Sequence, residues 1–82
     1  MATVYRIGNW NVIIYTNDHR PAHVHVVEGG SGRTAVFNLN CPDGPVELRE
    51  QIDVTKSELK KLRKELDRNV GYLCEEWRKI HG

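Results

Sequence analysis

The sequence has few cysteines and little net charge, two features that often indicate the class of a small protein. Its 82 residues include two cysteines, one methionine and one phenylalanine, and twelve basic against eleven acidic residues leave a net charge of +1. This balance excludes the general attraction to nucleic acid that strongly basic domains have, so any contact with RNA or DNA would be local. Cys41 and Cys74 show no CxxC spacing, which argues against a zinc ribbon and against a disulfide framework.

Long apolar runs are absent as well. The N-terminal MATVYRIGNW has neither the basic segment nor the apolar core of a signal peptide, and no run of apolar residues is long enough for a membrane span. We therefore expect no secretion, no membrane contact and a reducing, cytoplasmic location. A chain of this length forms one domain, residues 1–82, that buries roughly 60 to 65% of the surface of the unfolded chain.

Alternating apolar and β-branched residues predict two hairpins in the first half of the chain. The dipeptide Gly8-Asn9 is a tight-turn signal, and the glycine-rich residues 29–32 form a second tip. A connector, residues 17–22, separates the hairpins, and its Pro21 keeps the preceding residue out of the helical region. The predicted strands are residues 2–7, 10–16, 23–28 and 33–40.

The second half is predicted to be a connection followed by a helix. Residues 41–53 carry two prolines and a Pro-Asp-Gly turn, which leave at most a short edge strand at residues 46–48. Thr55 followed three residues later by Glu58 is a capping-box signature, so the helix should begin at about residue 55. Apolar residues then recur every three or four positions along one side. They are Leu59, Leu62, Leu66, Val70, Leu73, Trp77 and Ile80.

This spacing favours one continuous helix. About 26 helical residues would span about 39 Å, more than the roughly 20 to 25 Å of the strands. The helix should therefore bend at Asn69 and Gly71, or its free end should pack on a second copy in a homodimer. The predicted fold class is α+β. A small antiparallel sheet of three to four strands in two hairpins (residues 1–53, with the connector) is covered by one long C-terminal amphipathic helix (residues 54–81).

Three of the four histidines lie in one segment, DHRPAHVH. In the strand at its end, Val24 and Val26 should face the core. His23 and His25 then share the opposite face, and His19 lies in the turn that leads to them. The three imidazoles could converge, and three uses of such a cluster follow from their chemistry.

The first use is acid–base catalysis. Imidazole titrates near neutrality, so two histidines held close together can act as general base and general acid in RNA cleavage through the ribose 2′-OH. No metal or other cofactor is then expected. Arg20 or Arg33 would bind the phosphate, and Asp18 or Tyr15 would orient the imidazoles. The catalytic candidates are His19, His23 and His25.

The other two uses are metal binding and structure. An HxH pair on a strand with a third histidine nearby is a ligand set for a transition metal ion such as zinc, to which Glu28 or Asp18 could add a carboxylate. The alternative metal ligands are His19, His23 and His25. In the structural interpretation, solvent-facing histidines hydrogen-bond to one another and to Asp18 and shape the turn.

A basic stripe on the helix is a further candidate site. Lys60, Lys64 and Arg68 recur at four-residue steps and could contact phosphate groups. Such a stripe is more often a solvated face held by pairs four residues apart. The expected pairs are Lys61 with Glu65 and Arg63 with Asp67.

The segments VIIYTNDH, HRPAHVHV and AVFNL, with a helix that closes on LCEEWRKIHG, resemble a group of small bacterial proteins, the domain-of-unknown-function family 4160. The resemblance covers nearly the whole chain, and the spacing of His19, Pro21, His23 and His25 is its most specific part. That family usually has Pro-Pro-His-Phe-His at this point, whereas this chain has Pro-Ala-His-Val-His.

The resemblance implies a component of a gene pair of the toxin–antitoxin type. We expect the toxin side, which acts on RNA through the histidine cluster by metal-independent acid–base chemistry and has a small antitoxin-like partner protein. The alternative is a non-catalytic module in which the histidines hold a metal ion and the helix holds a partner protein.

Overall fold

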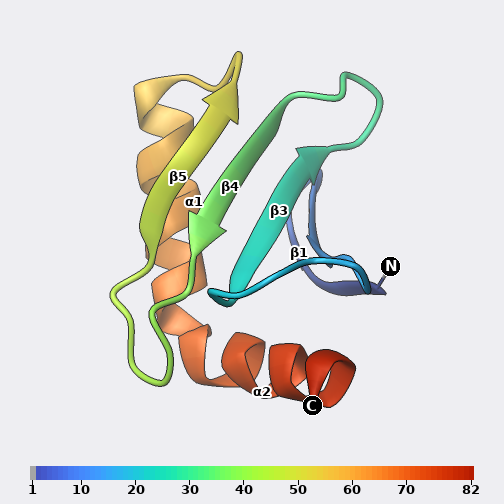
Figure 1. The fold of residues 1–82 in the computed structure, drawn as a ribbon. Coiled ribbons are helices and arrows are strands. Elements are labelled where there is room, and N and C mark those ends of the chain that lie inside the picture. The colour runs from blue at the N-terminus through green and yellow to red at the C-terminus, as the bar shows by residue number, and fades with distance from the viewer. Residues whose placement is uncertain (1) are drawn as a thin grey trace.

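The computed structural model describes residues 2–82 as a five-stranded antiparallel sheet with two helices (Figure 1). The strands lie in the sheet in the order in which they occur along the chain. They are β1 (Ala2–Ile7), β2 (Trp10–Ile14), β3 (His23–Glu28), β4 (Thr34–Asn38) and β5 (Glu47–Ile52). The helices are α1 (Lys56–Arg68) and α2 (Val70–His81).

The first four strands form the two predicted hairpins, but the prediction of three to four strands is wrong. Residues 47–52, where at most a short edge strand at residues 46–48 was expected, form a six-residue strand that pairs with β4. Its sequence, ELREQI, is exposed at every position except Leu48. Such a strand pairs through its backbone and carries no apolar alternation for a sequence pattern to detect.

The prediction of one long helix is also wrong. Asn69 separates the two helices, with φ −117° and ψ 16°. Its side-chain Nδ2 donates to the carbonyl oxygen of Glu65 at 2.9 Å and to the hydroxyl of Tyr5 at 3.2 Å, the kind of side-chain bond by which asparagine competes with helix. The break replaces the expected bend, and it turns α2 across the lower end of the sheet (Figure 1).

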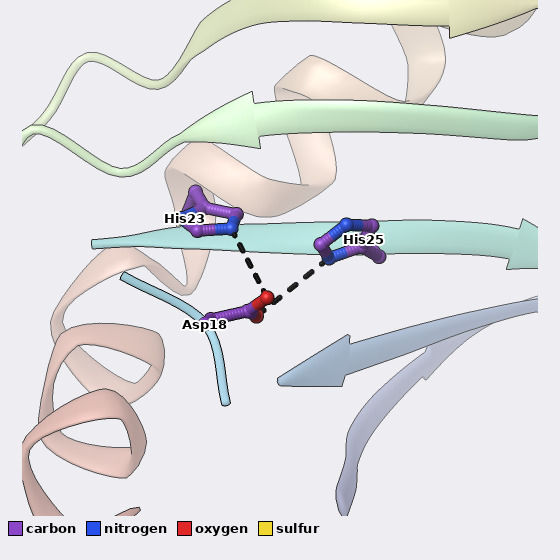
Figure 2. Close-up of side chains that lie close together, drawn as sticks. All are labelled: Asp18, His23 and His25. Carbon is purple, nitrogen blue, oxygen red and sulfur yellow. Dashed lines mark ion pairs between the residues drawn. The ribbon is translucent and has the colours of Figure 1, made fainter. Parts of the chain in front are cut away.

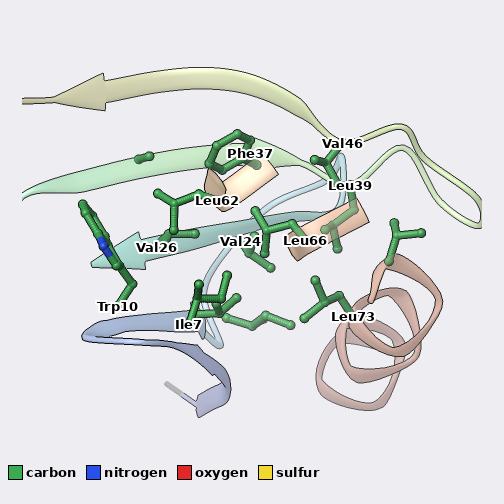
Figure 3. Close-up of a cluster of buried hydrophobic side chains, with 14 of the residues drawn as sticks. Ile7, Trp10, Val24, Val26, Phe37, Leu39, Val46, Leu62, Leu66 and Leu73 are labelled. Atoms are coloured by element: carbon green, nitrogen blue, oxygen red, sulfur yellow. The ribbon is translucent and has the colours of Figure 1, made fainter. Parts of the chain in front are cut away.

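The core lies between the helices and one face of the sheet (Figure 3). Val24 and Val26 are fully buried in it, which confirms the predicted inward face of β3. Both helices add to this core, because the break lets α1 run along one face of the sheet, behind β4 and β5 in Figure 1, while α2 lies across its lower end. Their buried apolar residues are Leu62, Leu66, Val70, Leu73 and Trp77.

Thr55 caps α1 as predicted. Its Oγ1 accepts the backbone N–H of Glu58 at 3.2 Å, and the Glu58 carboxylate accepts the backbone N–H of Thr55 at 3.0 Å. The capping box is therefore complete.

A disulfide joins Cys41 and Cys74, which corrects the expectation drawn from their spacing. They are 33 residues apart in sequence, and their Cα atoms are 5.8 Å apart. The turn at Asn69 brings α2 back to the segment after β4, a contact that no local pattern could indicate. The disulfide removes one basis for the expected cytoplasmic location, which stays a prediction. Within residues 2–82 no helix is long and apolar enough to cross a membrane.

Candidate metal centre

The two histidines of β3 lie on the sheet face opposite the core valines. In the antiparallel pairing, His23 lies opposite Asn38 of β4, and His25 lies between Ile13 of β2 and Val36 of β4. The centroids of the two imidazole rings are 5.3 Å apart. Strand alternation alone therefore places both rings on one face, as the sequence predicted.

Asp18 reaches this pair from the connector between β2 and β3. Its backbone N–H donates to the carbonyl oxygen of Tyr15 at 3.1 Å, and its Oδ2 accepts the backbone N–H of Tyr15, also at 3.1 Å. These reciprocal bonds close a four-residue turn and fix the carboxylate. Figure 2 shows the carboxylate facing both imidazoles.

The facing atoms of the three side chains are close together. Oδ1 of Asp18 lies 3.5 Å from Nε2 of His23, and Oδ2 lies 3.8 Å from Nδ1 of His25. One candidate ligand atom from each residue lies within 4.8 Å of the other two. The site is largely covered, since the exposed fractions are 12% for the Asp18 side chain, 6% for His23 and 24% for His25.

The hydrogen bond at Nδ1 of His23 determines which ring nitrogen carries the proton and which has the lone pair. Nδ1 lies 2.8 Å from the carbonyl oxygen of Pro21. A carbonyl oxygen only accepts hydrogen bonds, so Nδ1 carries the proton, and Nε2 of the neutral ring has a lone pair. This lone pair faces a carboxylate oxygen, an arrangement of two acceptors that a cation or a further proton between them would stabilise.

His25 is the second imidazole that faces Asp18. Its Nδ1 is buried and has no hydrogen-bond partner among residues 2–82. Burial lowers the pKa of His25 below 6.5; the charge of Asp18 opposes this effect, and His23 adds to it. The ring of Tyr15 packs edge-on against the imidazole, with the centroids 4.7 Å apart. His25 is therefore neutral at pH 7, and its Nδ1 presents a lone pair toward Asp18 in the tautomer that carries the proton on Nε2.

The other predicted site residues lie outside this cluster. His19 and Arg20 are exposed on the connector, and the cluster does not include them. Arg33 lies at the far end of the β3–β4 hairpin, where its guanidinium donates to both Glu28 and Glu58 at 2.7 to 3.0 Å. The structure thus does not bring Arg33, a candidate phosphate ligand, or Glu28, a candidate metal ligand, to the histidines.

Three neighbours of the cluster were not predicted. The ring of Trp77 lies 5.4 Å from that of His23, centroid to centroid, and His81 stacks on Trp77 at 3.9 Å. Asn38 is the cross-strand partner of His23, and its buried Oδ1 has no hydrogen-bond partner within residues 2–82. Strand register could have identified Asn38, whereas nothing in the sequence relates Trp77 to β3.

The fold and the cluster define a small α+β protein with one Asp and two His side chains converging on the sheet face opposite its core. The model of a family described as a domain of unknown function, DUF4160, matches residues 9–78. The chain therefore belongs to this family, which confirms the resemblance seen in the sequence. A search of curated proteins and a search of solved structures found no match.

Proposed function

We propose that Asp18, His23 and His25 form a binding site for one divalent transition metal ion. The observation that carries the proposal is the Asp18 carboxylate, which faces two imidazole nitrogens at 3.5 and 3.8 Å. Two histidines and one carboxylate are a ligand set of zinc and of non-haem iron. Ligand atoms about 2.1 Å from a tetrahedral ion lie about 3.4 Å apart; here the two nitrogens lie 3.5 and 3.8 Å from the two carboxylate oxygens, and one ligand atom of each residue lies within 4.8 Å of the other two.

The surroundings of the three residues support the proposal. Metal-binding histidines usually donate their second ring N–H to a carbonyl or carboxylate, which orients the ring. The bond from Nδ1 of His23 to Pro21 is of this type, and the backbone N–H of Tyr15 orients Asp18 in the same manner. Protons compete with metal for imidazole, so the lowered pKa of His25 favours binding near neutral pH.

The geometry supports metal binding better than acid–base catalysis by the same histidines. His23 is only 5% exposed, so a ribose hydroxyl has little access to its imidazole. His19, the third catalytic candidate, lies outside the cluster. RNA cleavage, the role in a toxin–antitoxin pair and the antitoxin-like partner stay predictions.

Equilibrium dialysis of the tag-free protein against zinc, followed by elemental analysis, tests the proposal. We expect about one zinc ion per chain in the wild type and close to none in His25→Ala. His19→Ala is the matched control, because it removes an exposed histidine of the same segment and should keep the full zinc content. Circular dichroism checks that both variants are folded. Zinc retained in both variants, or lost in both, would contradict the proposed ligands.

A further inference from the structure

The outer face of α1 carries a concentration of unpaired positive charge. Five of its basic side chains are exposed and take part in no ion pair among residues 2–82. We call them the α1 basic face: Lys56, Lys60, Lys61, Arg63 and Lys64. The protein as a whole has a net charge of only +1, so this face is a local feature.

The lysines are unpaired because the acidic residues of α1 are used elsewhere in the fold. Glu58 accepts hydrogen bonds from Arg33 at 2.7 and 2.8 Å. Asp67 accepts the backbone N–H of Val46 at 2.7 Å. The third carboxylate, that of Glu65, accepts a tyrosine hydroxyl of β1 at 3.3 Å.

The ion pairs expected along the helix are therefore missing. The sequence predicted pairs of Lys61 with Glu65 and of Arg63 with Asp67, but among residues 2–82 the one ion pair within α1 joins Arg68 to Glu65. The usual explanation of a basic stripe, a solvated face neutralised by pairs four residues apart, does not apply to this helix.

Two glutamates of β5 lie on the opposite side of the sheet. The pairing of β5 places Glu47 opposite Asn38 and Glu50 opposite Val36, on the same face as the two histidines. Asp18 lies over this face as well. Arg49 of β5 also acts on His25 and partly offsets these carboxylates, whereas the five cations of the α1 basic face have no ion-pair partner among residues 2–82.

We propose that the α1 basic face binds the phosphate backbone of a nucleic acid. From Lys56 to Lys64 the helix rises about 12 Å. Duplex DNA carries one negative charge per about 1.7 Å of axis, so a cationic face of this length meets several phosphates. Basic residues one turn apart lie side by side on a helix surface, which lets neighbouring cations contact neighbouring phosphates.

Nucleic acid fits this face better than an acidic protein does. Protein interfaces have apolar and aromatic residues at their centres and are depleted of lysine, whereas the exposed residues of this face are lysine, arginine and serine. The absence of aromatic side chains from α1 also removes the platform on which single-stranded bases stack. Binding should therefore depend on phosphates, vary little with sequence and weaken with salt.

This inference is independent of the metal site. The apolar side of α1 packs on the core face of the sheet, whereas Asp18 and the two histidines lie on the other face. His25→Ala should therefore abolish zinc binding and leave nucleic-acid binding within about twofold of the wild type. The two measurements are separate, so the failure of one proposal does not entail the failure of the other.

Fluorescence anisotropy with labelled duplexes of one sequence, made as RNA and as DNA, tests the proposal. Over a fourfold rise in salt, from about 50 to about 200 mM, four or five phosphate contacts should cost about 150- to 500-fold in affinity. Lys60→Glu with Lys64→Glu should cost at least about tenfold at the lower salt. Arg6→Glu with Arg49→Glu is the control, since it changes the net charge equally at exposed positions on β1 and β5.

The control double variant should bind within about twofold of the wild type. Binding of both duplexes supports contact with phosphates alone, and preference for one of them identifies the nucleic acid. Absence of salt-sensitive binding to either duplex would overturn the proposal, as would an equal loss in the two double variants. A tighter complex with a polyglutamate peptide than with either duplex would overturn it in favour of an acidic protein partner.

Discussion

Nε2 of His23 and Oδ1 of Asp18 face each other at 3.5 Å, while the other nitrogen of His23 is committed to the carbonyl oxygen of Pro21. In the neutral ring the facing atoms are both acceptors. A metal ion between them removes this conflict, and so does a proton that converts His23 to a cation. The two explanations differ in what added metal does to the residues around the site.

Trp77 should report on metal binding. Its ring lies 5.4 Å from that of His23, so a paramagnetic ion such as Ni²⁺ held by His23 should quench its fluorescence. Trp10→Phe leaves Trp77 as the one tryptophan of the chain. We expect saturable quenching of this variant as Ni²⁺ is added, with a midpoint that gives the affinity of the site.

The controls for quenching are two further substitutions. Adding His25→Ala to Trp10→Phe should remove the saturable phase. Trp77→Phe, in which Trp10 is the emitter, should show much weaker quenching, because Trp10 packs beneath Arg33 near the other end of the sheet. Equal quenching in all three proteins would mean that Ni²⁺ binds elsewhere.

Glu58 should make stability depend on pH in the acid range. Its hydrogen bonds with Arg33 lower its pKa from 4.5 to about 2. Because the pKa is lower in the folded state, the stabilisation is fully present above about pH 4.5 and is lost as the pH falls toward 2. Glu58→Gln keeps an oxygen for the Thr55 cap but loses the charge. The variant should melt at a lower temperature than the wild type at pH 7, and the difference should shrink steadily toward pH 2.

Glu47→Gln is the control for this effect. Glu47 is exposed and has no ion pair among residues 2–82, so its replacement should change the melting temperature little at any pH. A difference between Glu58→Gln and the wild type that stays constant from pH 7 to pH 2 would show that the charge of Glu58 is not the cause.

The disulfide should contribute measurably to stability. It links residues 33 positions apart, and closing a loop of this size typically stabilises a domain by about 2–4 kcal/mol. Urea unfolding of Cys41→Ser with Cys74→Ser should show a loss of this order. Dithiothreitol should lower the stability of the wild type to a similar extent and leave the double variant unchanged. Two free thiols per chain, titrated in unfolded and unreduced protein, would contradict the disulfide.

The strands were predictable from local residue types: β2 and β4 are β-branched and aromatic runs that are buried on both faces, and in β3 the valines that face the core alternate with histidines that face away from it. The capping box at Thr55 is a purely local arrangement as well. β5 has almost no alternation of apolar and polar residues, so the sequence indicated at most a short strand at residues 46–48. The apolar stripe from Leu59 to Ile80 continues through the break at Asn69, because both helices bury their apolar sides in one core.

The site was predictable in part for the same reason. Alternation placed His23 and His25 together, but a turn gives no periodic guide to its side chains. Asp18 is held inward by its bonds to Tyr15, whereas the adjacent His19 is exposed. Adjacent residues of one motif thus differ in their surroundings, and the carboxylate of Asp18 takes the place that was predicted for a third imidazole.

The central claim, that one metal ion is bound by Asp18, His23 and His25, is tested most directly by the imidazole nitrogens themselves. Long-range ¹H–¹⁵N correlation spectra of the labelled protein resolve Nδ1 and Nε2 of each histidine. With one equivalent of Zn²⁺, we predict large shifts of Nε2 of His23 and Nδ1 of His25, and unchanged signals from His19 and His81. The claim would be contradicted if the signals of His23 and His25 did not change on addition of Zn²⁺ and His23 were protonated on both nitrogens. The contact with Asp18 would then be an ion pair.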